Sequence, residues 1–320
     1  MRQDESIRSI VPAKLACSHK LENCTDSTLI WKCTVGWWSL TFSVLLVMFM
    51  TYYMFMRSNN TWSLAINSLE QTLQRQVVGQ EIANKRLIKL LSDYLKSEER
   101  IFSRPLSLLL VGGSGTGKSL MSKILASFFP LDSVHKLIIP LHLKNTPEFS
   151  QLPSYVERIA ADDKPHLFIA DDASSSLLQK VQEIIDSWPL PKSSFPVIFL
   201  CISNNQNSKL DEIVINHFHT NGQRNNIPEK YLYSNLEREI FGVSSSKPQI
   251  TTHVIPFLPL QRHHVEHCIK EELRSRGVID NHSYIVSKLL EETDFFPPSM
   301  PVFAVTGCKR ISRRVDLYLF

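Results

Sequence analysis

The 320-residue sequence lacks several features that would assign it to a class at once. It has no internal repeat and no low-complexity tract, which argues against a solenoid or a disordered chain. Its net charge is only +4 and is dispersed, apart from the short basic run KRISRR near the C-terminus. That run could meet acidic lipid or nucleic acid, but a solvated helix face is favoured, so no nucleic-acid partner is expected.

Cysteine is too sparse for a disulfide framework. Six cysteines divide evenly around one long apolar segment: Cys17, Cys24 and Cys33 precede or adjoin it, and Cys201, Cys268 and Cys308 follow it. Three cysteines on one side allow a single pair in an oxidising compartment. Stability must therefore come mainly from an apolar core, and 43% apolar residues in a chain of this length suffice for one large or two small domains.

The apolar segment spans residues 34–56 and carries no charge. About 20 apolar residues cross a bilayer as a helix, and aromatic pairs near both ends are typical of the membrane interface. The segment starts too far from Met1 and is too long for a signal peptide, and a buried helix this apolar all round is rare. We therefore predict a single-pass transmembrane helix over residues 34–56.

Basic residues suggest the orientation of this helix. Five precede it and two follow it closely: Arg2, Arg8, Lys14, Lys20 and Lys32 before, Arg57 and Arg75 after. The positive-inside bias favours a cytosolic N-terminal tail of residues 1–33, with the rest of the chain in a lumen. Two glycosylation sequons follow the span, and Asn281 is the better placed because Asn59 lies almost against the bilayer.

Apolar runs alternate with helical patterns after the span. Helical spacing covers Leu64 to Val77 and Ile82 to Leu95. Four continuous apolar runs predict buried strands: 106–111, 137–141, 167–170 and 197–202. Such runs separated by helices imply a parallel sheet covered on both faces. From Gln261 onward the pattern is helical, with Val265, Cys268, Ile269 and Leu273 on one face.

The first predicted strand leads directly into a phosphate-binding loop. Eight residues match G-x-x-x-x-G-K-[ST] between a strand and a helix, namely Gly112, Gly113, Ser114, Gly115, Thr116, Gly117, Lys118 and Ser119. Glycines let backbone N–H groups turn around phosphate oxygens, and the helix N-terminus adds a positive dipole end. Lys118 is expected to reach the β- and γ-phosphates, and the Ser119 hydroxyl to bind Mg²⁺.

The class of nucleotide follows by elimination. The sequence lacks the N-K-x-D signature for guanine and the L-S-G-G-Q signature of transporter ATPases. Adenine is therefore favoured, with ATP and Mg²⁺ as the expected ligands.

Polar side chains follow two other predicted strands. Asp171 is expected to bind Mg²⁺ opposite Ser119. Asp172 has two interpretations: it activates the attacking water, or it caps the helix that follows. Asn204 ends the next strand, where a polar side chain can hold the attacking water or the γ-phosphate.

In combination these residues resemble the torsins, AAA+ ATPases of the endoplasmic reticulum and nuclear envelope. The similarity begins near Leu69 and runs in order through about 250 residues. It includes Val-Gly-Gln at 78–80, the phosphate loop, Asp171, Ser-Asn at 203–204, Pro-Phe-Leu-Pro-Leu at 256–260, Ser-Arg-Gly at 275–277 and Gly-Cys-Lys at 307–309. The transmembrane segment, Gly-Lys-Ser in the loop and Asp-Asp at the strand end resemble the membrane-anchored branch of that family.

The resemblance implies an α/β fold with a parallel sheet in αβα layers and a small C-terminal helical lid. We place the nucleotide-binding domain at residues 57–255 and the lid at 256–320. The resemblance implies that Lys309 is the sensor of the lid, which touches the γ-phosphate. It also pairs Cys268 with Cys308, either as a disulfide coupled to nucleotide binding or as two buried thiols.

The resemblance also implies the partners and the function of the protein. Torsins lack their own arginine finger, which a lamina-associated type of membrane protein supplies in trans, and they assemble as homo- or hetero-oligomers. Two functions follow. The first is ATP-driven, chaperone-like remodelling in the lumen of the endoplasmic reticulum or nuclear envelope. The second is a nucleotide-gated scaffold with little hydrolysis, because the Asp172 carboxylate lies roughly 1.5 Å nearer the backbone than that of a glutamate.

Overall fold

The structure is a computed structural model that describes most of the chain after residue 63. The described residues are 42–50, 64–95, 104–137, 152–161, 164–188, 195–204, 207–242, 252–278 and 282–319. Two compact units are present, residues 1–58 and 59–320, and the fold below is that of the second. The predicted tail 1–33 and Asn281 lie outside the described residues. Of the predicted span 34–56, only 42–50 is described, as a helix.

A search of the described residues for a helix long and apolar enough to cross a membrane finds none.

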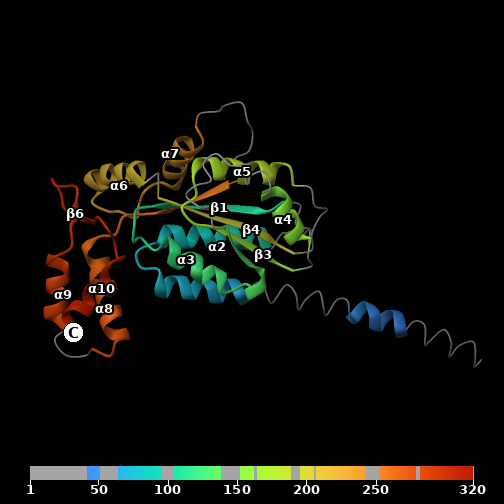
Figure 1. The fold of residues 1–320 in the computed structure, drawn as a ribbon, viewed down its shortest axis with the longest axis horizontal. Helices are drawn as coiled ribbons and strands as arrows, with labels where there is room; N and C mark the ends of the chain where they lie inside the picture. Colours follow the sequence, from blue (N-terminus) through green and yellow to red (C-terminus); the bar gives the residue numbers. More distant parts are fainter. Residues whose placement is uncertain are drawn as a thin grey trace, which may run out of the picture. The chain divides into compact units, whose positions relative to one another are not determined.

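A five-stranded parallel sheet forms the centre of the larger unit. Its strands lie in the order β2-β3-β4-β1-β5 (Figure 1). The bounds are β1 Leu106–Gly112, β2 Val134–Leu137, β3 His166–Ala170, β4 Val197–Ser203 and β5 Thr252–Phe257. Strands β1, β3 and β4 are buried along their whole length, as the continuous apolar runs predicted.

Strand β2 begins earlier than predicted. We predicted residues 137–141, but the strand covers Val134–Leu137, and residues 138–141 lie outside the described part. Among the described strands β2 pairs only with β3, so it lies at an edge of the sheet, and it is partly exposed. An edge strand needs no continuous apolar run, so the first residues of β2 gave no apolar signal in the sequence.

Strand β5 was missed for a related reason. Its sequence, Thr-His-Val-Ile-Pro-Phe, contains a histidine and Pro256, and a proline within an apolar run argues against a central strand. β5 pairs only with β1 among the described strands. At an edge, the N–H that Pro256 lacks leaves no partner unsatisfied.

Helices cover both faces of the sheet. On one face the helix over 64–76, α2 Glu81–Leu95 and α3 Lys118–Ala126 pack on one set of strand side chains. On the other, α4 Leu152–Ala160, α5 Ser175–Asp186, α6 Asn207–Asn221 and α7 Glu229–Phe241 pack on the alternate set. Strand β1 shows the alternation directly, since Leu108 and Leu110 face the first group and Leu109 and Val111 the second. Figure 1 shows these two helical layers around the sheet.

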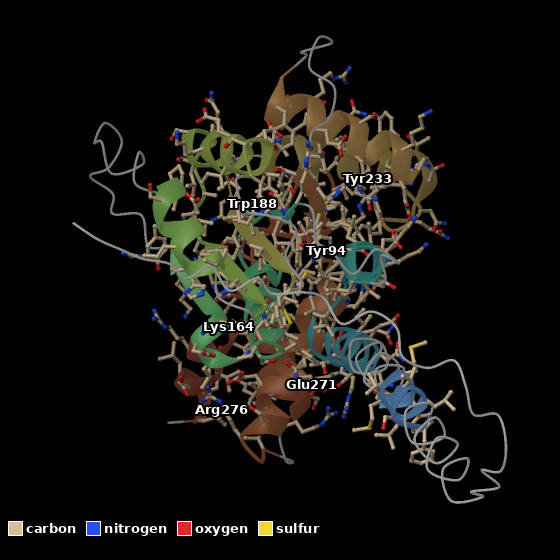
Figure 2. The ribbon with its side chains drawn as sticks, turned by 90° about the vertical axis from the view of Figure 1, so that its right-hand side faces the viewer. Tyr94, Lys164, Trp188, Tyr233, Glu271 and Arg276 are labelled. Atoms are coloured by element: carbon tan, nitrogen blue, oxygen red, sulfur yellow. A yellow bond between two sulfur atoms is a disulfide. The ribbon has the colours of Figure 1, made fainter. Side chains whose placement is uncertain are left out.

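The C-terminal helices have a core of their own. Helices α8 Arg262–Ser275, α9 His282–Glu291 and α10 Ile311–Leu319 enclose an apolar cluster that includes Val265, Leu289 and Val315. We call these three helices and the chain between them the lid. Arg276, labelled in Figure 2, binds Glu272 of α8 and Asp316 of α10, and so joins the two helices.

The lid is not helical throughout, which corrects the prediction made from Gln261 onward. Strands β6 Phe295–Phe296 and β7 Phe303–Ala304 form a short antiparallel pair between α9 and α10. Each of these strands has only two residues, which is too few for an alternating pattern to be recognised in the sequence.

A matched pair of substitutions tests this core. Leu110 is fully buried in β1, whereas Leu131 is 96% exposed. Leu110→Ala should lower the free energy of unfolding by about 2–5 kcal/mol, because it removes buried methyl groups and leaves a cavity. Leu131→Ala should change it by less than about 0.5 kcal/mol. Denaturant unfolding measures both values, and equal effects would contradict the assigned burial.

Candidate functional site

The phosphate loop connects the end of β1 to the start of α3. Gly112, Gly115 and Gly117 all have positive φ, of 154°, 72° and 108°. This conformation is accessible to glycine, and in loops of this sequence pattern it allows successive N–H groups to turn toward a bound anion. Gly117 is the N-cap of α3 and no side chain caps the helix, so its first N–H groups are free of a side-chain acceptor. The loop therefore has the backbone geometry of an anion site.

Lys118 lies over this loop. The ammonium nitrogen Nζ donates hydrogen bonds to the carbonyl oxygens of Gly112 and Gly113 at 2.7 and 2.6 Å. Burial lowers the pKa of Lys118 to about 8, and the charges of Asp171, Asp172 and Asp211 act against that shift. Ser119, the next residue, is exposed at the mouth of the loop.

The two acids and the asparagine meet at the carboxyl edge of the sheet. Asp171 and Asp172 follow β3, and Asn204 follows β4, which pairs with β3. The Asn204 amide donates a hydrogen bond to the Asp172 carboxylate at 2.8 Å, and the Asp172 N–H donates to Asp171 at 3.0 Å. Asp172 has φ 52°, the one positive φ outside glycine among the described residues. Its backbone is thus held in an uncommon conformation beside the site.

Helix α5 does not use Asp172 as its cap. The N-cap is Ser174, whose hydroxyl accepts a hydrogen bond from the N–H of Leu177 at 3.3 Å. Of the two interpretations of Asp172, the capping one therefore loses its structural basis. The carboxylate is directed instead to Asn204.

The lid reaches the phosphate loop through backbone contacts. The N–H of Cys308 donates to the carbonyl oxygen of Gly115 at 3.0 Å. A Cβ on Gly115 would lie 2.0 Å from the Thr306 carbonyl oxygen, and one on Gly307 would lie 2.4 Å from that of Gly115. Two glycines are thus required for the loop and the lid to touch. Lys309, which follows, is exposed and close enough for its charge to act on the pKa of Lys118.

Cys308 also forms a disulfide with Cys268 of α8. The bond joins the turn that contacts Gly115 to the first helix of the lid. A redox coupling of this bond to nucleotide binding stays a prediction.

Three buried polar groups of this region were not predicted as site residues, and Gln80 was named only within the Val-Gly-Gln of the torsin resemblance. Gln80 and Arg224 are buried and bind backbone carbonyls. Asp211, in α6, has one carboxylate oxygen that is buried without a hydrogen-bond partner among the described residues. Each is a polar residue in or next to a helical segment, where a solvated position is the ordinary expectation. No group of three or more potential metal ligands occurs within the described ranges.

Sequence profiles of two known families match the chain. The profile described as Torsin matches residues 51–162, and that of the torsin-1A C-terminal domain matches residues 260–318. Together they cover more than half of the chain, including the phosphate loop and the Gly-Cys-Lys turn. The chain belongs to the torsin family of AAA+ proteins.

Solved structures agree with this torsin fold. A closed-state cryo-EM reconstruction of Hsp104 with ATPγS and FITC-casein aligns with a TM-score of 0.52 at 15% identity, over 80% of this chain and 46% of that one. An S. cerevisiae Hsp104–ADP complex aligns with a TM-score of 0.49 at 14% identity, over 80% and 47%. The torsin chain spans under half the length of these proteins. The first similarity supports the α/β AAA+ fold alone.

Asp211 gives the torsin chain a pH-dependent stability that can be tested. Burial raises the pKa of Asp211 from 3.8 to about 6, although Lys118 acts against the shift. A raised pKa means that ionisation costs the folded state more than the unfolded one, so this group destabilises the fold as pH rises from about 4 through about 6. Asp211→Asn should remove the cost and stabilise by at most about 3 kcal/mol above about pH 7, with little gain near pH 3.5, below the unfolded pKa.

Denaturant unfolding at the two pH values measures that difference. Glu212→Gln on the same helix is the control, because its side chain is 56% exposed and pairs with Lys209 at the surface. A gain from Asp211→Asn that is the same at both pH values would show that its ionisation is not penalised in the fold.

Proposed function

We propose that this torsin-family chain is a membrane-anchored ATPase that drives chaperone-like remodelling. The observation that carries the proposal is the convergence of Lys118, Asp171, Asp172 and Asn204 at one edge of the sheet, with Lys309 brought there by the lid. These are the side chains that phosphoryl chemistry needs: a cation for the phosphates, a metal ligand, a group for the attacking water and a charge sensor.

The residues present fit a nucleoside triphosphate. The uncapped start of α3 and the positive-φ glycines form a cradle of N–H groups for phosphate oxygens. Lys118 already lies over that cradle. Ser119 and Asp171 would hold Mg²⁺, a hard cation that prefers oxygen ligands and, when bound, screens phosphate charge. The Hsp104 structure that shares the fold was solved with ATPγS, which supports the same ligand class here.

Asp172 and Asn204 would act on the attacking water. The Asp172 carboxylate can accept a proton from water, and Asn204 fixes its orientation through the 2.8 Å hydrogen bond. Lys309 would stabilise negative charge at the γ-phosphate from the lid side. In this arrangement the catalytic groups come from two strand ends and one lid turn, so hydrolysis requires the lid in place.

A nucleotide-gated scaffold with little hydrolysis is the second candidate. One observation favours it: the carboxylate of Asp172 is shorter in reach than that of a glutamate and is already bound to Asn204. A misplacement of about 1 Å can cost on the order of a hundredfold in rate. Under this alternative, ATP binding alone would switch the protein.

Steady-state ATP turnover and equilibrium ATP binding separate the two candidates. Lys118→Ala should weaken ATP binding about 10- to 100-fold, because it removes charge-assisted hydrogen bonds to phosphate, and turnover should fall to background. Asp172→Asn should leave binding within about threefold but reduce turnover on the order of a hundredfold or more. Asp186→Asn, at the exposed far end of α5, is the matched control and should change neither.

The assay is run with and without candidate activating membrane proteins. If Asp172→Asn leaves an existing rate untouched, Asp172 is not the group that activates water. A wild-type chain that binds ATP but never turns it over, with any activator, would favour the scaffold.

The proposed setting is the lumen of the endoplasmic reticulum or nuclear envelope. The apolar segment 34–56 would anchor the chain, with residues 1–33 in the cytosol. Torsin membership supports work as an oligomer, with an arginine supplied in trans by a lamina-associated type of membrane protein. The client of the remodelling would be a protein or membrane assembly of that compartment.

Glycosylation reports the orientation. In intact microsomes, a lumenal Asn281 should acquire a glycan that Asn281→Gln abolishes, and the region after residue 57 should resist added protease. An unglycosylated Asn281 together with digestion of the large unit would place it in the cytosol. Asn23, in a sequon before the span, serves as the control and should stay unmodified.

A further inference from the structure

Arg224 is a deeply buried cation near the phosphate loop that has no role in the proposed hydrolysis. It lies between α6 and α7, and its side chain is 1% exposed. Its guanidinium donates to the carbonyl oxygen of Pro259 at 2.8 Å and to that of Gly79. The exposed Glu81 lies 3.5 Å away as a counter-ion. An arginine is rarely buried unless paired, so these contacts must offset its desolvation.

The two carbonyls belong to two segments that are far apart in the sequence. Gly79 belongs to residues 77–81, between the helix over 64–76 and the first turn of α2. Pro259 lies in the connection from β5 to α8, where the chain leaves the sheet and enters the lid. Arg224 therefore bridges the nucleotide-binding domain and the base of the lid with one planar side chain. A guanidinium suits this task because its donors are fixed in a fork.

Residues 77–81 also lie on the phosphate loop. The Gln80 amide donates to the carbonyl oxygens of Thr116 at 3.1 Å and Leu258 at 2.8 Å, and accepts from the Leu258 N–H at 2.9 Å. A Cβ on Gly117 would lie 3.3 Å from the Val77 side chain. A shift of residues 77–81 would therefore change the position of the phosphate loop.

The first turn of α8, which belongs to the lid, also contacts residues 77–81. The ring of His264 packs on Gly79 so closely that a Cβ there would lie 2.4 Å from it. His264 Nδ1 accepts a hydrogen bond from the Gln261 N–H at 3.1 Å, which fixes the ring at the start of the helix. Gly79 is thus held by Arg224 at its carbonyl and by His264 at its α-carbon.

We propose that Arg224 is a positioning residue of the nucleotide site, which joins residues 77–81 on the phosphate loop to the Pro259 base of the lid. This inference rests on the proposed nucleotide binding. Nucleotide that orders the loop would, through Gln80 and Arg224, also order the start of the lid. Lid position and nucleotide occupancy then become coupled, so that a filled loop would stabilise the lid position that holds Lys309 at the site.

Hydrogen exchange on the full chain, with ATP and Mg²⁺ as the probe, tests the proposal. In the wild type, ATP should slow exchange at residues 113–119, 77–81 and 258–264 together. Arg224→Lys, which keeps the charge but loses the fork, should keep ATP protection at 113–119 and lose it at 258–264. Its ATP affinity should fall about tenfold. Arg238→Lys is the matched control on the exposed face of α7 and should behave as wild type.

Gln80→Ala provides a second variant that leaves the buried charge in place. It should likewise uncouple 258–264 from ATP, and the double variant should weaken binding by less than the product of the single effects, because both residues hold one segment. ATP protection of 258–264 that survives in both single variants would overturn the proposal. A wild type that binds no ATP would instead refute the proposed nucleotide function, independently of these variants.

Discussion

The parallel pairing of β1 between β4 and β5 is the constraint on which the site depends. Its register sets Val111 beside Ser203 on one side and beside Pro256 on the other. Because β3 pairs with β4 in the same direction, Ala170 lies beside Cys201. The phosphate loop, the two acids, Asn204 and the entry to the lid therefore all leave the sheet at one edge, as ligand sites of open parallel sheets do. A shift in this register would separate the groups.

Close backbone approach is the second condition, and small residues provide it. The turn of Gly307 and Cys308 touches Gly115 with no side chain between the two backbones. The disulfide to α8 and the bridge of Arg276 to Asp316 hold that turn within the lid. The lid can thus move as one rigid unit relative to the phosphate loop, since its three helices share one core. Lys309 takes its place from this packing and from the hydrogen bond that its N–H donates to the Thr306 carbonyl oxygen.

Sequence patterns predicted the central part of the fold because they report local burial. Strands β1, β3 and β4 are buried on both faces, so each reads as an unbroken apolar run. Edge strands β2 and β5 gave no such signal, and Pro256 gave a contrary one. Asp172 shows the same limit within the site. Its position after a strand suited both water activation and a helix cap, and only the placement of Ser174 and Asn204 separated the two.

The sequence by itself determined the phosphate loop, the acidic strand end and membership of the torsin family. Each is recognised from short motifs of contiguous residues, whose spacing the backbone fixes. Only the tertiary structure decided which distant groups act on them. Gln80 meets Leu258 across 178 positions, and Arg224 meets Gly79 across 145. Asp211 becomes a costly buried acid through the packing of α6 near Lys118. Such contacts depend on chain topology, and no local periodicity records them.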